Sequence, residues 1–188
     1  SIWNGHIIKN EKLGSEGYAT FRLKILVSEN QRLDLSIDEL MSAYKCWCNV
    51  NDIFTCGQVS SEANGAMPRQ FPVVRNIELK KDTTILIFQI SNFHHRAGGF
   101  FTSPRIGTEE SIFQARIIKI AFDLFLFGAI LIISFYHFGL YFMRREKPTV
   151  LYFGLFTLLM AIRTIFTGSF IISIPFPEIS WFIKYRIE

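Results

Sequence analysis

The sequence predicts an all-β sandwich or jelly-roll domain followed by transmembrane α-helices. Apolar and polar side chains alternate in short runs through residues 1–112, and turn residues separate these runs, as is typical of strands. Residues 120–143 and 149–172 form two nearly unbroken apolar runs. A helix of about 20 residues crosses roughly 30 Å of hydrocarbon, so each run is long enough to span a bilayer. We therefore divide the chain into a β domain at 1–112 and a transmembrane region at 113–188.

A period of two predicts the individual strands. In residues 18–27, apolar side chains such as Phe21 and Ile25 alternate with polar ones such as Thr20 and Lys24, so one face of this strand is expected to be buried. Further strands are predicted at residues 33–38, 44–50, 53–59 and 84–91. Many short strands with frequent turns favour a sandwich or jelly roll of the whole segment.

The charge of the chain is distributed unevenly. The 188 residues are 49% hydrophobic and 19% charged, and the net charge is +4. Residues 1–112 carry equal numbers of basic and acidic side chains, so residues 113–188 supply the whole excess. A neutral β domain lacks the basic surface that nucleic acid requires, and we exclude nucleic acid as a partner.

Six residues form the predicted ligand-binding site. The loop after the strand at 84–91 concentrates hydrogen-bonding side chains, aromatic rings and a pair of glycines, and loops at the end of a sandwich often carry recognition. Aromatic rings beside amide and guanidinium groups suit sugars. The predicted residues are Tyr44, Trp47, Asn92, His94, His95 and Arg96. The alternatives are a solvated loop without a ligand and a core position for Trp47.

No catalytic residue, metal site or cofactor is predicted. His94 and His95 are adjacent, and neighbouring side chains of an extended chain point to opposite sides, so the two are not expected to share a metal ion. The sequence has no Ser/His/Asp arrangement and no phosphate-binding loop. We therefore expect no enzyme activity within these residues.

The three cysteines allow two interpretations. Cys46 and Cys48 are two residues apart and share a face of their strand, while Cys56 follows on the next one. If the domain lies outside the cytoplasm, either could form a disulfide with Cys56. Three buried free thiols are the alternative that we favour.

Basic residues predict the topology in the membrane. Arg144, Arg145 and Lys147 lie between the two apolar runs, whereas residues 173–178 after the second run contain no Lys or Arg. The positive-inside rule then makes the first loop cytoplasmic and places the β domain outside the cytoplasm.

The sequence also contains signals at the ends of the spans. Acidic residues at 109–110 suit the first turn of a helix that leads into the first span without a flexible linker. A third span is predicted to begin at about residue 179, where aromatic side chains suit a membrane interface. Because the chain begins at Ser1 and ends at Glu188 as this span begins, we expect it to be a fragment of a longer protein.

Three ionisable side chains lie within the predicted spans, namely Asp123, His137 and Arg163. Such groups are costly in hydrocarbon and usually face the interior of a helix bundle. Asp123 and His137 project about 40° apart around a helix, so one face of the first span is predicted to meet other helices. A pairing of Asp123 with Arg163 is a further hypothesis.

A series of short motifs resembles one family. The motifs are GYATFR at 17–22, SAYKCWCN at 42–49, ISNFHHRAGG at 90–99, IG at 106–107, FG at 127–128, YH at 136–137, YFGL at 152–155 and AIR at 161–163. In this order they are similar to the bacterial seven-transmembrane receptors with diverse intracellular signalling modules. Members of that family tend to carry Asn-Gly where this chain has Asn49-Val50. Since Val resists positive φ, we expect a longer turn here, over residues 49–52.

The resemblance implies a receptor in the cytoplasmic (inner) membrane. Its extracytoplasmic domain would be a galactose-binding-like jelly roll, similar to the sugar-binding domains of certain glycoside hydrolases. It would sense a carbohydrate-like ligand and pass the signal to a histidine kinase, a diguanylate cyclase or a nucleotide cyclase that these residues do not include. The expected partners are the lipid bilayer, a carbohydrate-like small molecule, this cytoplasmic module and a second copy of the chain.

Two other functions stay open at this point. In a membrane-anchored carbohydrate-binding or glycosidase-accessory module, the spans would serve only as an anchor. In a transporter fragment, the ionisable residues of the spans would line a path. A kinase or cyclase domain, a glycosidase barrel, or about twelve spans with internal repeats in the full-length sequence would distinguish the three.

Overall fold

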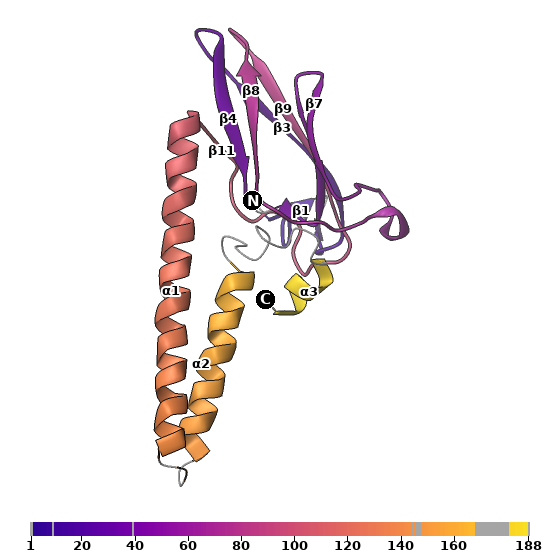
Figure 1. Cartoon of the computed structure of the whole chain (residues 1–188). Helices are drawn as coiled ribbons and strands as arrows, with labels where there is room; N and C mark the ends of the chain where they lie inside the picture. The colour runs from indigo at the N-terminus through magenta and orange to yellow at the C-terminus, as the bar shows by residue number, and fades with distance from the viewer. Residues whose placement is uncertain are drawn as a thin grey trace. The chain divides into compact units, whose positions relative to one another are not determined.

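A computed structural model of the chain describes residues 2–8, 10–38, 40–143, 145, 148–167 and 181–187, with the backbone only at 8, 11, 184 and 187. The chain forms two compact units, Ser1–Phe113 and Gln114–Glu188. Figure 1 shows that strands make up most of the first unit and helices the second.

Antiparallel sheets build the first unit. One sheet has four strands in the order β3-β9-β6-β7, and another has three in the order β11-β4-β8. Two short strand pairs, β1–β2 and β5–β10, accompany them. The strands are β1 Ile7–Ile8, β2 Glu11–Lys12, β3 Gly17–Ile25, β4 Gln31–Ile37, β5 Leu40–Met41, β6 Ala43–Cys48, β7 Asn51–Cys56, β8 Val73–Leu79, β9 Thr84–Asn92, β10 Gly99–Phe100 and β11 Arg105–Gly107. The prediction of an all-β domain is confirmed, and its sheets are antiparallel.

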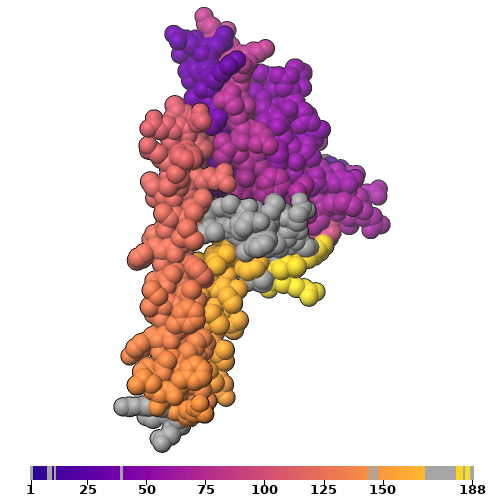
Figure 2. All heavy atoms as spheres, viewed as in Figure 1, coloured from indigo at the N-terminus to yellow at the C-terminus, as the bar shows by residue number. Residues whose placement is uncertain are grey.

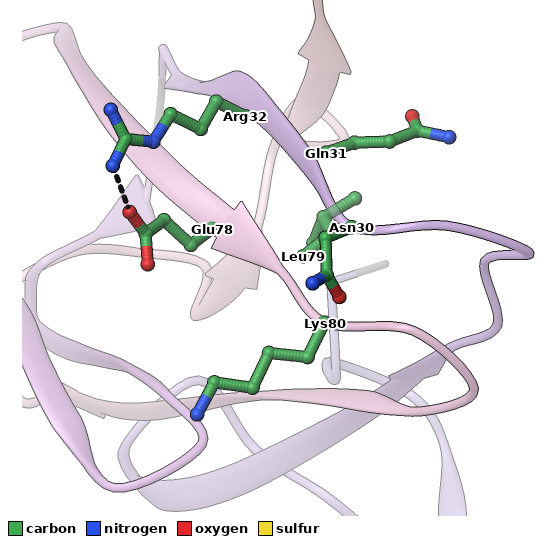
Figure 3. A pocket seen from close by; sticks show the side chains of 6 residues that line it. All are labelled: Asn30, Gln31, Arg32, Glu78, Leu79 and Lys80. Carbon is green, nitrogen blue, oxygen red and sulfur yellow. Dashed lines mark hydrogen bonds and ion pairs between the residues drawn. The ribbon is translucent and has the colours of Figure 1, made fainter.

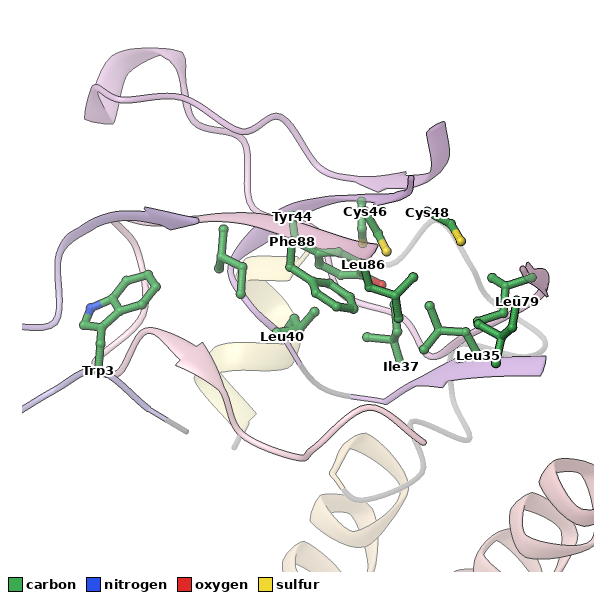
Figure 4. Packing of buried hydrophobic residues seen from close by; sticks show 13 residues of the cluster. Trp3, Leu35, Ile37, Leu40, Tyr44, Cys46, Cys48, Leu79, Leu86 and Phe88 are labelled. Atoms are coloured by element: carbon green, nitrogen blue, oxygen red, sulfur yellow. The ribbon is translucent and has the colours of Figure 1, made fainter. Parts of the chain in front are cut away.

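The two larger sheets share one hydrophobic core (Figure 4). The four-stranded sheet contributes Tyr44, Cys46, Cys48, Leu86, Phe88 and Ile90, and the three-stranded sheet contributes Leu35, Ile37, Ile77 and Leu79. Alternate residues of each strand enter this core, as the period of two predicts. The pattern does not predict β8, because the polar residues at 75–76 interrupt its apolar run.

The hairpin between β6 and β7 corrects one prediction. The expected turn over residues 49–52 is wrong, because Cys48 pairs with Asn51 and leaves only Asn49-Val50 as the turn. Asn49 adopts a φ of 55°, which Asn tolerates better than most residues, and its Oδ1 atom accepts a hydrogen bond from the Ile85 amide at 2.9 Å. The pairing of β6 with β7 also shifts in register between Cys46 and Trp47, which is an irregularity within the strands and not in the turn.

The three cysteines are present as buried thiols. Cys46, Cys48 and Cys56 are all free and buried. The side chains of Cys46 and Cys48 face the same core, and the Cys56 thiol donates a weak hydrogen bond to the carbonyl oxygen of Arg69 at 3.2 Å. Packing and not a disulfide therefore accounts for these cysteines in the structure.

The helical part begins where the acidic residues predict. Helix α1 spans Glu109–Met143 without a break, so the predicted first span is the C-terminal part of a longer helix. Thr108 caps α1, because its Oγ1 atom accepts a hydrogen bond from the Ser111 amide at 3.3 Å. Helix α2 spans Pro148–Phe166, with proline in the first turn where its missing N–H costs nothing.

Helix α3 spans Trp181–Ile187 and makes the first described residues of the predicted third span helical. The indole of Trp181 stacks on the ring of Tyr185, with 5.0 Å between the ring centres. The predicted end of the second span at 168–172, the loop at 173–178, and Arg144 and Lys147 lie outside the described residues.

Within the described residues, two helices, α1 and α2, are long and apolar enough to cross a membrane. Their large apolar side chains are mostly exposed, among them Phe122, Phe125 and Ile132 of α1 and Phe156 of α2. The atoms of these two helices are the pink to orange spheres of Figure 2. The core helix of a water-soluble protein would bury such side chains, so their exposure is typical of helices that face lipid.

Candidate ligand-binding site

Asn92 ends β9 and shapes the loop that follows. Its side chain is fully buried, with 0% exposed. The Oδ1 atom accepts a hydrogen bond from the His95 amide at 3.0 Å, and the Nδ2 group donates to the carbonyl oxygens of His95 at 2.8 Å and Ser15 at 2.9 Å. Since these partners are main-chain groups of the protein itself, Asn92 is a structural residue of the loop.

The imidazole of His95 is also enclosed by its own loop. The ring is buried, and its Nδ1 atom lies 2.8 Å from the carbonyl oxygen of Ala97. Its edge meets the ring of Phe101, with 5.3 Å between the ring centres. Neither Asn92 nor His95 presents a surface to a ligand, whereas His94 is half-buried and Arg96 is exposed.

The same loop holds the N-terminal segment of the chain. The Trp3 amide donates to the carbonyl oxygen of Gly98 at 3.0 Å, the Asn4 Nδ2 group donates to that of Arg96 at 3.0 Å, and the Asn4 Oδ1 atom accepts from the Gly98 amide at 2.9 Å. The backbone at Gly98 also lies against the indole of Trp3, where a side chain at position 98 would not fit. This close contact explains the glycine at this position.

Tyr44 lies in the core and not at the surface. Only 2% of the residue is exposed, and its hydroxyl has no hydrogen-bond partner among the described residues. Burial raises the pKa of this phenol, and the neighbouring thiols of Cys56 and Cys46 raise it further. The predicted ligand contact of Tyr44 therefore does not fit its position.

Trp47 lies on the outer face of the four-stranded sheet, so the alternative of a core position is wrong. The strand register arranges the outer side chains in two rows, Thr20-Gln89-Lys45-Thr55 and Arg22-Ile87-Trp47-Asp52. The Lys45 Nζ atom lies 2.7 Å from Asp52 Oδ2 and 5.1 Å from the centre of a Trp47 ring. We call these two rows the outer sheet face. They combine an aromatic surface with amide, hydroxyl and charged groups.

A polar hollow of about 230 Å³ adjoins the outer sheet face. Tyr18, Thr20 and Gln89 line it from the sheet, and the segment 59–61 lines it from the side. Tyr18 is 65% exposed, so much of its side chain is accessible to a ligand. The alternation in residues 18–27 places Tyr18 and Thr20 outward, but their closeness to Gln89 depends on the pairing of β3 with β9, which the sequence pattern does not reveal.

A second hollow of about 380 Å³ lies at the ends of β4 and β8 (Figure 3). Two of its three charged side chains pair with each other, since the Arg32 guanidinium lies 2.7 Å from Glu78 Oε1, and the third is Lys80. Both side chains are exposed, and such surface pairs contribute little energy. This hollow presents no buried polar group that a ligand would satisfy.

An apolar cavity of about 330 Å³ lies between the two sheets. It is lined by Phe21, Arg22, Leu23, Leu35, Leu86, Phe88, Phe100, Ser103, Pro104 and Ile106. The apolar side chains make up most of this lining, so the cavity suits a hydrocarbon group better than a sugar.

The three ionisable residues of the spans occupy different positions. His137 lies where α1 meets α2, because its ring packs on Phe153 with 4.6 Å between the ring centres, and its Nδ1 atom lies 2.8 Å from the Ile133 carbonyl oxygen. Arg163 lies in the last turn of α2. Asp123 is half-buried in α1, and its pairing with Arg163 stays a prediction.

No group of three or more His, Cys, Asp and Glu side chains that could hold a metal ion occurs within the described residues. The described part of the site therefore consists of hydrogen-bonding and aromatic groups, which can bind a ligand without a metal.

Comparisons with known proteins identify the membrane part. Residues 119–188 match the family model described as 7TM diverse intracellular signalling, and the predicted family is thereby confirmed. No curated protein matches the chain. Two solved structures of a GH2 β-galacturonidase from Eisenbergiella tayi, one bound to galacturonate and one to glycerol, have TM-scores of 0.37 and 0.38 at 11% identity. Each match covers 57% of this chain and 23% of the other, so the chain spans less than a quarter of their length.

Proposed function

The chain belongs, through residues 119–188, to the 7TM diverse intracellular signalling family, and we propose that it is the sensor and the first membrane helices of a receptor. The strands form a galactose-binding-like jelly roll outside the cytoplasm, and the helices lie in the inner membrane. The signal passes to a cytoplasmic histidine kinase, diguanylate cyclase or nucleotide cyclase. A second copy of the chain is a further proposed partner.

One observation carries this proposal. Helix α1 begins directly after β11 and continues as one helix through the apolar run to Met143. A flexible linker would absorb a displacement of the last strand, whereas a continuous helix transmits it. A ligand that binds one arrangement of the strands better than another then shifts the population of helix arrangements by its difference in affinity.

The proposed ligand is carbohydrate-like and binds at the outer sheet face. Trp47 supplies a flat apolar surface for the C–H face of a sugar ring, and Tyr18 supplies a second one at the polar hollow. Gln89 and Thr20 provide donors and acceptors for hydroxyl groups. His94 and Arg96 remain proposed contacts from the adjacent loop.

Binding of the full chain, held in lipid nanodiscs, to a panel of immobilised glycans tests the ligand. Trp47→Ala should weaken binding about tenfold, equivalent to about 1.4 kcal/mol. Val50→Ala is the matched control, because Val50 lies at the tip of the same hairpin and is 92% exposed. Binding to no glycan, or equal binding by the two variants, would contradict a sugar site on this face.

A further inference from the structure

The apolar cavity between the sheets is built from paired residues of neighbouring strands. Phe21 pairs with Phe88 and Leu23 pairs with Leu86 across β3 and β9, which gives one wall. On the opposite wall, Leu35 of β4 pairs with Ile106 of β11. β3 and β11 are the edge strands of their sheets, so the cavity lies at the side of the sandwich where the core reaches the surface.

Aromatic contacts define one end of this cavity. The ring of Phe100 meets the rings of Phe21 and Phe88 edge to face, with 4.9 Å and 5.3 Å between the ring centres. Leu23 is 49% exposed although it points to the core side of β3, because the cavity leaves its side chain uncovered. Exposed apolar surface of this kind, in a cavity within the roughly 300–1,000 Å³ range of small-molecule sites, favours binding of a hydrocarbon group.

The charge at the cavity is positive. Arg22 points to the outer face of β3 and lines the cavity at its rim, because β3 is the edge strand. It is exposed, and no acidic side chain pairs with Arg22 within the described part of the chain. The hydroxyl of Ser103 lies on the same lining and is also exposed. A guanidinium can donate two parallel, charge-assisted hydrogen bonds to a carboxylate, so the lining combines an apolar chamber with an anion-binding group.

We infer that this cavity binds a small aliphatic carboxylate, with its hydrocarbon chain between the sheets and its carboxylate at Arg22. This ligand differs in chemistry from the sugar proposed at the outer sheet face. Arg22 belongs to that face as well, but none of the proposed sugar contacts uses it, so neither site depends on the other.

The position of the cavity gives such a ligand a direct effect on the first helix. Ser103, Pro104 and Ile106 belong to the segment that enters α1, and Thr108 caps the helix two residues after Ile106. Ile112 of the first turn is buried and packs at Gly107 of β11. A ligand that fills the cavity therefore restricts the motion of β11 and of the first turn of α1.

Photolabelling of the full chain in lipid nanodiscs tests this site. The probe is decanoate that carries a diazirine in its chain, and labelled peptides are mapped by mass spectrometry. We expect label in the peptides that contain residues 21–23 and 100–106, competed by unlabelled decanoate and not by decanol. Label confined to the membrane helices, or equal competition by decanol, would overturn the proposal.

Three variants connect the label to the cavity. Arg22→Gln should weaken competition by decanoate about tenfold, the effect of losing one charge-assisted hydrogen-bonded pair. Ser103→Trp should abolish the label, because an indole from this exposed position fills the cavity without altering the core. Lys24→Gln removes a cation from the same face of β3 outside the cavity and should leave the label unchanged. Equal effects of the Arg22 and Lys24 variants would contradict a carboxylate site.

Hydrogen exchange provides a readout that does not depend on photochemistry. Decanoate should slow amide exchange in residues 103–112 of the wild-type chain and not in the Ser103→Trp variant. Unchanged exchange in this segment would contradict the restricted motion of α1.

Discussion

Ser134 of α1 donates a hydrogen bond to the main-chain carbonyl oxygen of Gly154 in α2, with 2.8 Å between the two oxygen atoms. The Thr157 hydroxyl donates to the same carbonyl at 3.0 Å. Ser134, Gly154 and Thr157 are all buried, so small residues line this contact between the two helices. Small side chains permit the close backbone approach that holds membrane helices together where the hydrophobic effect cannot.

Replacing Gly154 should separate the two helices. A Cβ atom at this position would lie 2.9 Å from Cε1 of Phe138, so Gly154→Ala forces a shift that costs about 1–3 kcal/mol. The measurement is the fraction of SDS at which the helices of the full chain dissociate, followed by energy transfer between labels on α1 and α2. Gly139→Ala is the control, because a Cβ there meets nothing within 4 Å. Equal midpoints for the two variants would show that this contact does not hold the helices together.

The core hydroxyl of Tyr44 should be dispensable. It is buried without a hydrogen-bond partner among the described residues, and an unsatisfied buried hydroxyl costs about 1–3 kcal/mol. Tyr44→Phe should therefore keep or raise the free energy of unfolding, measured in urea by Trp fluorescence of the full chain. A loss of stability in this variant would mean that the hydroxyl has a partner, and would return Tyr44 to the candidates for ligand binding.

The buried thiols should make the β unit sensitive to alkali. Burial raises the pKa of Cys46 from 9.0 to about 12, and burial raises that of Cys48 in the same direction. An unfolded thiol ionises near pH 9 and a folded one does not. The stabilisation is therefore complete below pH 9 and is lost as the pH rises from 9 towards 12.

The urea midpoint at pH 8, 9 and 10 measures this effect. Wild-type protein should lose stability over this range, and Cys46→Ala should lose less over the same range, whatever its stability at pH 8. The phenol of Tyr44 contributes in the same direction above its ordinary pKa of 10.0, so the comparison is made at or below pH 10. Identical pH slopes in the two proteins would contradict the raised pKa of Cys46.

A side chain at Gly98 should release the N-terminal segment. A Cβ atom at this position overlaps the indole of Trp3, so Gly98→Ala must displace the ring or break the hydrogen bond between the Trp3 amide and Gly98. Trypsin should then cleave after Lys12 several-fold faster than in wild type. Gly14→Ala, where a Cβ meets nothing within 4 Å, should cleave at the wild-type rate. An unchanged rate in the Gly98 variant would show that the loop does not hold this segment.

Local sequence patterns determined the elements of this protein. The period of two predicts β3, β4 and β9 and the inward face of Cys46 and Cys48, because side chains alternate across any strand whatever its neighbours. The uninterrupted apolar run and the acids at 109–110 predict α1 and its start, because helix length and capping are local properties.

Only the tertiary structure decided which residues meet. The sequence predicts Asn92 and His95 as binding residues, yet both side chains are buried and bond to main-chain groups, His95 within its own loop and Asn92 also at Ser15. Trp47 keeps an outward position beside Lys45 and Asp52. The apolar cavity forms where β3 and β11, the edge strands of the two larger sheets, both contribute side chains to its lining. These neighbours come from pairing between strands distant in sequence. A repeat of two residues tells which face a side chain takes but not which strand lies next to it.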